Sequence, residues 1–446
     1  MSETRKPGIK ALIESRDWRT LRETMAEWRA QDIADLLSDL GKEHRVLLFR
    51  SLPRSVAADV LSCFDPDDQE HIIAELTDEE TRQILAGLRP DDRTALLEEL
   101  PGKVTQKLLN LLSPEDLREA RQLLGYPENS VGRIMTPDYI AVRPEWTVDQ
   151  TMSHVRKHGK DKETINTVYV TDASWRLLGS VSLSQLVLAE PSTPVSALMT
   201  VPAVSLSAFA DREETTRTLA KYGLFVLPVV DSDGILVGIV TGDDVLELAS
   251  EEATEDFQKA AAVRPIERSF ADASVWLLFK NRIGWLMTLI FVDLVAAGVI
   301  ARYEHAISRV VALAFFMPLL IGMGGNAGTQ CSTLVVRDLA TGDVDYGDWL
   351  ALLSKELVTS LLLGVTISLV VWGPSVLQGG SSVGVVVALS GVAIVTLSSL
   401  IGIGTPLLLG RLGADPAASS SPLITSIADI AGVLIYFAIA SWYLKI

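Results

Sequence analysis

Five long apolar segments after Lys280 constrain the fold of this chain more than any other feature. A membrane-spanning helix needs about 20 predominantly apolar residues, and each segment has about that length or more. Only helices and closed barrels can cross a bilayer, because their backbone polar groups are paired internally. The segments cover residues 283–301, 310–336, 350–373, 383–410 and 422–444. We therefore predict an α-helical membrane domain with five spans over residues 276–446.

The second apolar segment, residues 310–336, carries no charge but has a polar middle. Its central residues are small or polar: Gly322, Gly324, Gly325, Asn326, Gly328, Thr329 and Gln330. Glycine lets helices approach closely, and polar groups at this depth are tolerated only against protein or a water-filled cavity. Close packing alone explains the glycines, whereas the neighbouring amide side chains favour the wall of a pore.

Two carboxylates lie deep in the apolar segments, Asp293 in the first and Asp429 in the fifth. A charge inside a bilayer costs several kcal/mol, so such residues pair, titrate or line an ion path. No Lys or Arg lies in a span near the depth of Asp429. This favours an ion ligand over a protonated structural acid at that position. The surroundings of Asp293 in the sequence assign it no role.

The part of the chain before the apolar segments is acidic. The formal net charge is −17, and residues 281–446 contain 7 Lys/Arg and 9 Asp/Glu, so −15 belongs to residues 1–280. This balance argues against nucleic acid as a partner and suits cations. The polar start MSETRKPGIK is not a signal peptide, and the two cysteines form no disulfide framework. Together with Lys and Arg near the span ends, these features place the N-terminal half in the cytoplasm.

Residues 1–128 are predicted to form an all-α superhelical domain, because apolar anchors recur every 12 residues. The anchors are Leu40, Leu52, Phe64, Leu76, Leu88, Leu100 and Leu112. Apolar residues also stand three and four positions before each anchor, which completes one helical face. Helix caps or breakers such as Pro53, Pro90 and Pro101 follow the anchors. Stacked short helices of this kind bury their faces on their neighbours.

A second internal repeat covers residues 129–196 and 197–246. Met135-Thr136 recurs as Met199-Thr200, and the segments with Gly179 and Gly238 are similar to each other. Each copy is predicted as strand, helix, strand, turn, strand and helix. The pair resembles a tandem CBS (cystathionine β-synthase) domain of α/β type.

A CBS pair implies ligand sensing, with Ser/Thr-x-x-Asp holding a ribose. The second copy has this motif as Thr241 and Asp244, whereas the first has Ser182 and Gln185. The missing carboxylate at Gln185 weakens the prediction of nucleotide binding, so ATP is an open possibility. Ordinary helix N-capping explains Thr241 and Asp244 equally well.

Residues 247–275 are predicted as a connecting helix that leads to the membrane domain. Glu247/Glu251, Glu251/Glu255 and Glu252/Asp256 are like-charged pairs one turn apart. Each pair costs about 0.2–0.5 kcal/mol in an isolated helix. The helix therefore either presents a solvated face or binds a cation there.

Three stretches resemble the MgtE family of magnesium channels: residues 315–344, residues 412–437 and the acidic segment ELASEEATED at 247–256. The order of domains is similar too. The resemblance implies a homodimeric Mg²⁺ channel in the cell membrane, with a pore lined by the second and fifth spans. It places hydrated Mg²⁺ at Asp429, helped by backbone near Gly322 and by Asn326 and Thr329. Several relatives have Asn in place of Thr329.

The same resemblance implies that cytosolic Mg²⁺ closes the channel by bridging acidic faces of the soluble domains. The implied sensor residues are Asp91, Asp211, Glu213, Asp244, Glu247, Glu252, Glu255, Asp256 and Asp415. Gly223 and Ala95 stand where relatives can have acidic residues. The connecting-helix acids match the family pattern.

Two other functions are weighed against the Mg²⁺ channel. A CBS-regulated carrier for another solute could be driven by protons through Asp293 and Asp429. A membrane-anchored adaptor would need only one span, so the five spans argue against it. An enzyme is not expected, because the sequence has no Ser/His/Asp constellation or cysteine cluster and only five histidines.

Overall fold

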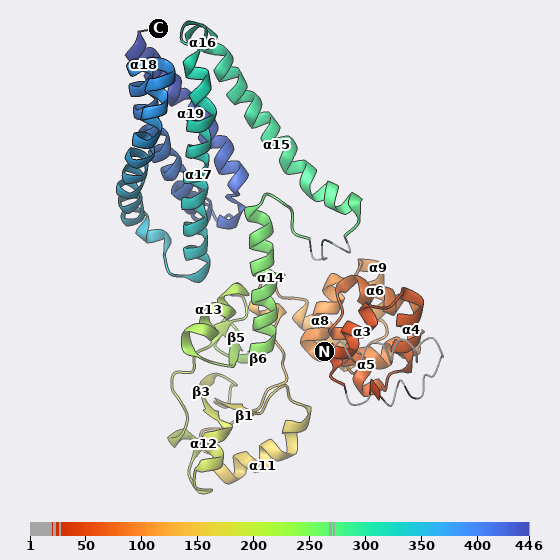
Figure 1. Ribbon diagram of the computed structural model, residues 1–446. Coiled ribbons are helices and arrows are strands. Elements are labelled where there is room, and N and C mark those ends of the chain that lie inside the picture. Colours follow the sequence, from red (N-terminus) through yellow and green to blue (C-terminus); the bar gives the residue numbers. More distant parts are fainter. Residues whose placement is uncertain (1–19, 21–23, 26–27, 267–269, 271–272, 446) are drawn as a thin grey trace. The chain divides into compact units, whose positions relative to one another are not determined.

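A computed structural model describes residues 20, 24–25, 28–266, 270 and 273–445 of the chain (Figure 1). It divides into two compact units, Met1–Ala249 and Ser250–Ile446. The predicted start of the superhelical domain and part of the predicted connecting segment 247–275 lie outside the described residues.

Short helices fill the N-terminal part of the first unit, as the repeat predicts. They are α3 (Ala30–Ser38), α4 (Lys42–Ser51), α5 (Arg54–Ser62), α6 (Pro66–Glu75), α7 (Asp78–Leu85), α8 (Pro90–Glu99), α9 (Gly102–Leu109) and α10 (Pro114–Leu123). Side chains cap the starts of two of them, α7 and α10. Thr77 and Glu80 form a reciprocal capping box on α7, and Ser113 accepts a hydrogen bond from the Asp116 amide on α10.

One apolar core runs through these helices. Every anchor residue of the 12-residue repeat, and the residues three and four positions before each anchor, either belong to this core or pack against it. Each helix is too short to be stable alone, so burial of one face against its neighbours holds it. The prediction of an all-α stack is confirmed.

The two α/β repeats have the same order of elements, which confirms the predicted order. The first contains β1 (Ala141–Val142), α11 (Val148–His158), β2 (Thr167–Thr171), β3 (Leu177–Ser182) and α12 (Leu183–Leu188). The second contains β4 (Leu206–Ser207), α13 (Glu213–Tyr222), β5 (Val226–Val230), β6 (Leu236–Thr241) and α14 (Gly242–Ala260). In each copy the first strand pairs in parallel with the second, and the second pairs antiparallel with the third.

The repeated motifs pack each copy against the other. A Cβ on Gly179 of the first copy would lie 2.7 Å from the carbonyl oxygen of Thr200 in the second. A Cβ on Gly238 of the second copy would lie 2.7 Å from Sδ of Met135 in the first. Both glycines are therefore required by close contact between the copies. Isolated bridges from Thr136 to Ile239 and from Ser180 to Thr200 complete this reciprocal seam.

Long apolar helices form the second unit after α14. They are α15 (Val275–Arg302), α17 (Ala312–Thr341), α18 (Trp349–Arg411) and α19 (Ser421–Leu444), with the short α16 (Glu304–Arg309) between α15 and α17. By length and composition, four helices in the described part of the chain could cross a membrane. The first begins at Val275, earlier than the predicted residue 283.

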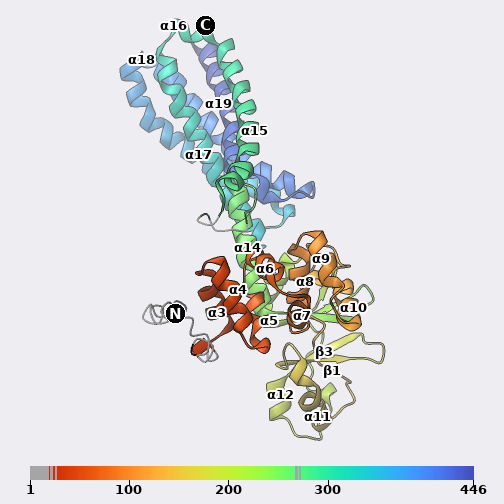
Figure 2. The same ribbon diagram turned by 90° about the vertical axis from the view of Figure 1, so that its right-hand side faces the viewer.

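The third and fourth predicted spans are joined in α18. The segment between these two predicted spans, residues 374–382, is not a loop, because helix continues through it except at Gly380, whose φ of 82° and ψ of 173° break it. A straight helix of 63 residues would be about 95 Å long, three times the hydrocarbon core. Instead the halves run side by side (Figures 1 and 2), and a Cβ on Gly364 would lie 3.0 Å from Cα of Val392. The chain thus offers five membrane crossings.

Candidate functional site

The polar middle of α17 divides into a packed face and an open face. Gly324, Gly325 and Gly328 are buried, and a Cβ on any of them would lie within 3 Å of an atom of α18 or α19. Gly322 and Asn326 are exposed, and a Cβ on Gly322 would meet nothing within 4 Å. Close helix packing therefore explains some of these glycines, and an open polar face contains another. Three of them pack, and Gly322 lies on the open side with Asn326, one turn away.

Thr329 connects the open face of α17 to α19. Its hydroxyl oxygen lies 3.4 Å from that of Thr425, and Thr425 is one turn before Asp429 on the same helix. Asp429 is half-buried, and one of its carboxylate oxygens is buried without a hydrogen-bond partner in the part of the chain that is described. Asp429 thus lies one turn along α19 from a pair of hydroxyl groups that joins α17 to α19, and no basic side chain among the described residues forms an ion pair with it.

Asp293, to which the sequence assigned no role, reaches the same turn of α19. The hydroxyl of Ser426 donates a hydrogen bond of 3.3 Å to its carboxylate. Ser426 is one turn before Asp429, so the two carboxylates approach the same part of α19. Sequence reasoning missed this contact because α15 and α19 are far apart in the chain.

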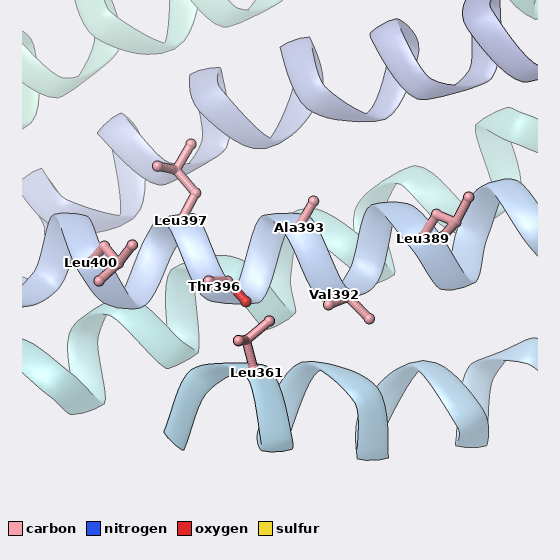
Figure 3. Close-up of a pocket in the computed structure, with 7 residues that line it drawn as sticks. All are labelled: Leu361, Leu389, Val392, Ala393, Thr396, Leu397 and Leu400. Carbon is pink, nitrogen blue, oxygen red and sulfur yellow. The ribbon is translucent and has the colours of Figure 1, made fainter. Parts of the chain in front are cut away.

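A hollow of about 370 Å³ between the halves of α18 is a different kind of site (Figure 3). Leu361 lines it from one half, and mainly aliphatic residues line it from the other. Thr396 supplies the one hydroxyl among the lining residues. Without carboxylates it is not a candidate for holding a cation.

Acidic residues gather in the first unit around Arg89. Burial raises the pKa of Asp91 to about 8, and the charges of Asp244 and Asp92 add to the rise. Burial also raises the pKa of Asp92 to about 6, although the guanidinium of Arg89 opposes the shift. Glu163 accepts a hydrogen bond of 2.5 Å from Arg89, and its side chain is 6% exposed. The structure thus brings together the predicted residues Asp91 and Asp244 and adds Asp92 and Glu163.

Asp211 and Glu213 bond to residues close to them in the sequence, at the start of α13. The Asp211 carboxylate accepts a hydrogen bond of 3.0 Å from the Glu213 amide, and Glu213 forms an ion pair of 3.1 Å with Arg217.

Glu247, another predicted sensor residue, lies near enough to Asp92 to contribute to the raised pKa of Asp92. Across the described residues, no three His, Cys, Asp or Glu side chains are grouped to hold a metal ion.

Four predicted sensor residues meet around Lys259 in the second unit. The ammonium of Lys259 lies 2.7 Å from Glu255 and 2.6 Å from Asp415. Burial raises the pKa of Asp256, and the nearby charge of Asp415 raises it further. Glu252 contributes to the same shift. A cation of the protein itself, which the sequence analysis overlooked, thus lies among these acids.

The two residues predicted to bind a ribose, Thr241 and Asp244, are hydrogen-bonded to each other. The hydroxyl of Thr241 donates a hydrogen bond of 2.5 Å to Asp244 at the start of α14. In the first copy, Ser182 and Gln185 form a capping box on α12. Both pairs therefore occupy helix starts, and a ribose would have to replace the Thr241–Asp244 bond.

Family models match most of the chain. One described as a divalent cation transporter, MgtE, matches residues 317–439, and one for the MgtE intracellular N domain matches residues 28–129. The CBS domain model matches residues 131–192 and 195–251.

Curated relatives and solved structures are similar to the whole chain or to its first part. The magnesium transporter MgtE of Thermus thermophilus is 38% identical over 100% of both chains. That of Bacillus subtilis is 36% identical over 72% of this chain and 71% of the relative. The cytosolic domain of the Mg²⁺ channel MgtE in complex with ATP matches with a TM-score of 0.52 and 38% identity, over 54% of this chain and 98% of that structure.

Proposed function

The chain belongs to the MgtE family of magnesium transporters, and we propose that its membrane helices conduct Mg²⁺ past Asp429. The family transports divalent cations and is not a family of enzymes. The chain is accordingly a multi-pass membrane protein. We place its first unit in the cytoplasm and its long helices in the cell membrane.

The observation that carries the proposal is the Asp429 carboxylate within an apolar helix. It has no basic partner among the described residues, and it lies one turn after Thr425, whose hydroxyl oxygen is 3.4 Å from that of Thr329 on α17. We propose that Gly322 and Asn326 on the open face of α17 line the same path. Mg²⁺ gives up its water reluctantly, so one or two carboxylates bind it through its hydration shell. A half-buried carboxylate one turn from the hydroxyl groups of Thr425 and Thr329 suits such an ion.

We propose that two chains complete the site. A twofold axis is the commonest oligomer symmetry, and it would bring two copies of Asp429 to one ion. A divalent ion that crosses a membrane potential of about 100 mV gains about 4.6 kcal/mol, twice the value for one charge. Uptake therefore needs no further energy source.

Mg²⁺ uptake into proteoliposomes tests the pore assignment. Asp429→Asn should abolish uptake while the protein still elutes as a folded dimer. Asp343→Asn is the matched control, because it removes an exposed carboxylate outside the helices. Normal uptake by the Asp429 variant would refute the assignment.

We further propose that cytosolic Mg²⁺ closes the path by binding the acids of α14. Glu252, Glu255 and Asp256 lie near Asp415, which precedes α19, so a divalent ion there would tie α14 to the helix that carries Asp429. Mg²⁺ shifts the population towards whichever state brings these acids together. We infer the same for Asp91 and Asp244 in the first unit, with Asp211, Glu213 and Glu247 as further candidate ligands.

Inhibition by millimolar Mg²⁺ on the cytosolic side tests this regulation. The double variant Asp256→Asn, Asp415→Asn should conduct at Mg²⁺ concentrations that close the wild type. Asp149→Asn, an exposed change on α11, should behave as wild type. Full inhibition of the double variant would place the sensor elsewhere.

We also propose that ATP binds at Thr241 and Asp244, since a similar cytosolic domain was solved with ATP. A hydroxyl and a carboxylate one turn apart can hold two adjacent sugar hydroxyls.

A further inference from the structure

Asp293 lies inside the apolar part of α15, nine residues before the helix ends at Arg302. Its side chain is exposed on the surface of the single chain. A charge that faced lipid at this depth would cost several kcal/mol, so such a residue faces water or protein instead. The position therefore needs a polar partner or water within the spans.

The hydrogen bond from Ser426 shows where that environment is. Ser426 is one turn before Asp429 on α19, and its hydroxyl donates to Asp293 at 3.3 Å. No Lys, Arg or His forms an ion pair with Asp293 or Asp429 within the described ranges. The carboxylate of Asp293, bonded to Ser426, and that of Asp429, one turn further along α19, repel each other unless a cation lies close to both.

We propose that Asp293 is a second acidic residue of the ion path, held in place by Ser426, and that it attracts the same hydrated divalent cation as Asp429. This inference rests on the proposed function. It adds a carboxylate from α15 to a path otherwise formed by α17 and α19. Each chain then contributes two negative charges, which favours divalent over monovalent cations.

The expected effect follows from Coulomb's law. A divalent ion about 7 Å from a unit charge in a water-filled path is stabilised about sevenfold (about 1.2 kcal/mol). In proteoliposomes, Asp293→Asn should therefore raise the half-saturating Mg²⁺ concentration by about fivefold to tenfold. Asp293→Glu, which keeps the charge, should stay within about twofold of the wild type. Thr288→Val is the matched control on α15, because its hydroxyl bonds back to the Gly284 carbonyl.

Ser426→Ala tests the position of the Asp293 carboxylate without removing its charge. It leaves both carboxylates in the protein and frees Asp293 from α19, so half-saturation should rise by less than in Asp293→Asn. It also supplies a second readout if the Asp293 variants do not fold.

Each outcome is decisive. Half-saturation unchanged in Asp293→Asn, or in Ser426→Ala when the former does not fold, would overturn the inference and leave the pore assignment intact. Uptake that required a pH gradient and lost this requirement in Asp293→Asn would also overturn it, because Asp293 would then carry protons. A wild-type protein that took up no Mg²⁺ would refute the proposed function itself.

Discussion

Replacing Gly328 by alanine should destabilise the membrane unit, whereas the same change at Gly322 should not. A Cβ on Gly328 would lie 2.8 Å from the carbonyl oxygen of Ser398 and 3.1 Å from Cγ2 of Ile424. Ordinary contact begins at 3.4 Å, so α17 and α18 would have to separate by about 0.6 Å. The Ser398 oxygen belongs to the backbone and cannot rotate away. A Cβ on Gly322 would meet nothing within 4 Å.

The comparison of the two variants isolates the cost of packing. Alanine is favoured over glycine inside a helix by about 1 kcal/mol, and this gain is common to both positions. Overpacking costs about 1–3 kcal/mol. The difference in unfolding free energy between the variants is therefore about 1–3 kcal/mol, with Gly328→Ala the less stable.

Thermal unfolding of both variants in one detergent measures this difference. For a unit of this size, the midpoint of Gly328→Ala should lie about 2–12 °C below that of Gly322→Ala. Equal midpoints would show that Gly328 is not required by close packing, and the division of α17 into two faces would fail.

Two further predictions concern the first unit. The folded pKa of Asp91, about 8, lies above its ordinary 3.8, so its contribution to stability is fully present below about pH 4 and is lost as the pH rises through about 8. Unfolding temperature in Mg²⁺-free buffer should therefore fall between about pH 4 and 8, and Asp91→Asn should make this fall shallower; the same profile in Asp91→Asn as in the wild type would contradict the burial of Asp91. Asp244→Asn should weaken ATP binding measured by calorimetry about tenfold or more, since it removes a charged hydrogen-bond acceptor, and equal affinity in the variant would place any nucleotide elsewhere.

Patterns with a fixed period predicted the fold well. The 12-residue anchors of α3–α10 and the repeated α/β segments needed only local periodicity, because each element buries one face against its neighbour. The spans predicted at 350–373 and 383–410 place a reversal between them, but not helix that continues up to Gly380. Composition shows where apolar helix can extend, but not that a single glycine with positive φ reverses the chain.

The site was predicted less completely than the fold. Asp429 and the polar face of α17 follow from charge and amide groups within apolar segments. Asp293 and Lys259 were missed because their partners, Ser426 and Asp415, are more than 100 residues away along the chain. Contacts between such distant residues leave no periodic pattern in the sequence.

The position of a bound divalent ion tests the central claim most directly. Crystals of the wild-type protein soaked with Mn²⁺, which scatters anomalously, should show a peak between the Asp429 carboxylates of two chains, and this peak should be absent in Asp429→Asn. Carboxylates of Asp429 that face lipid, or a peak within the spans that persists in the variant, would contradict the account.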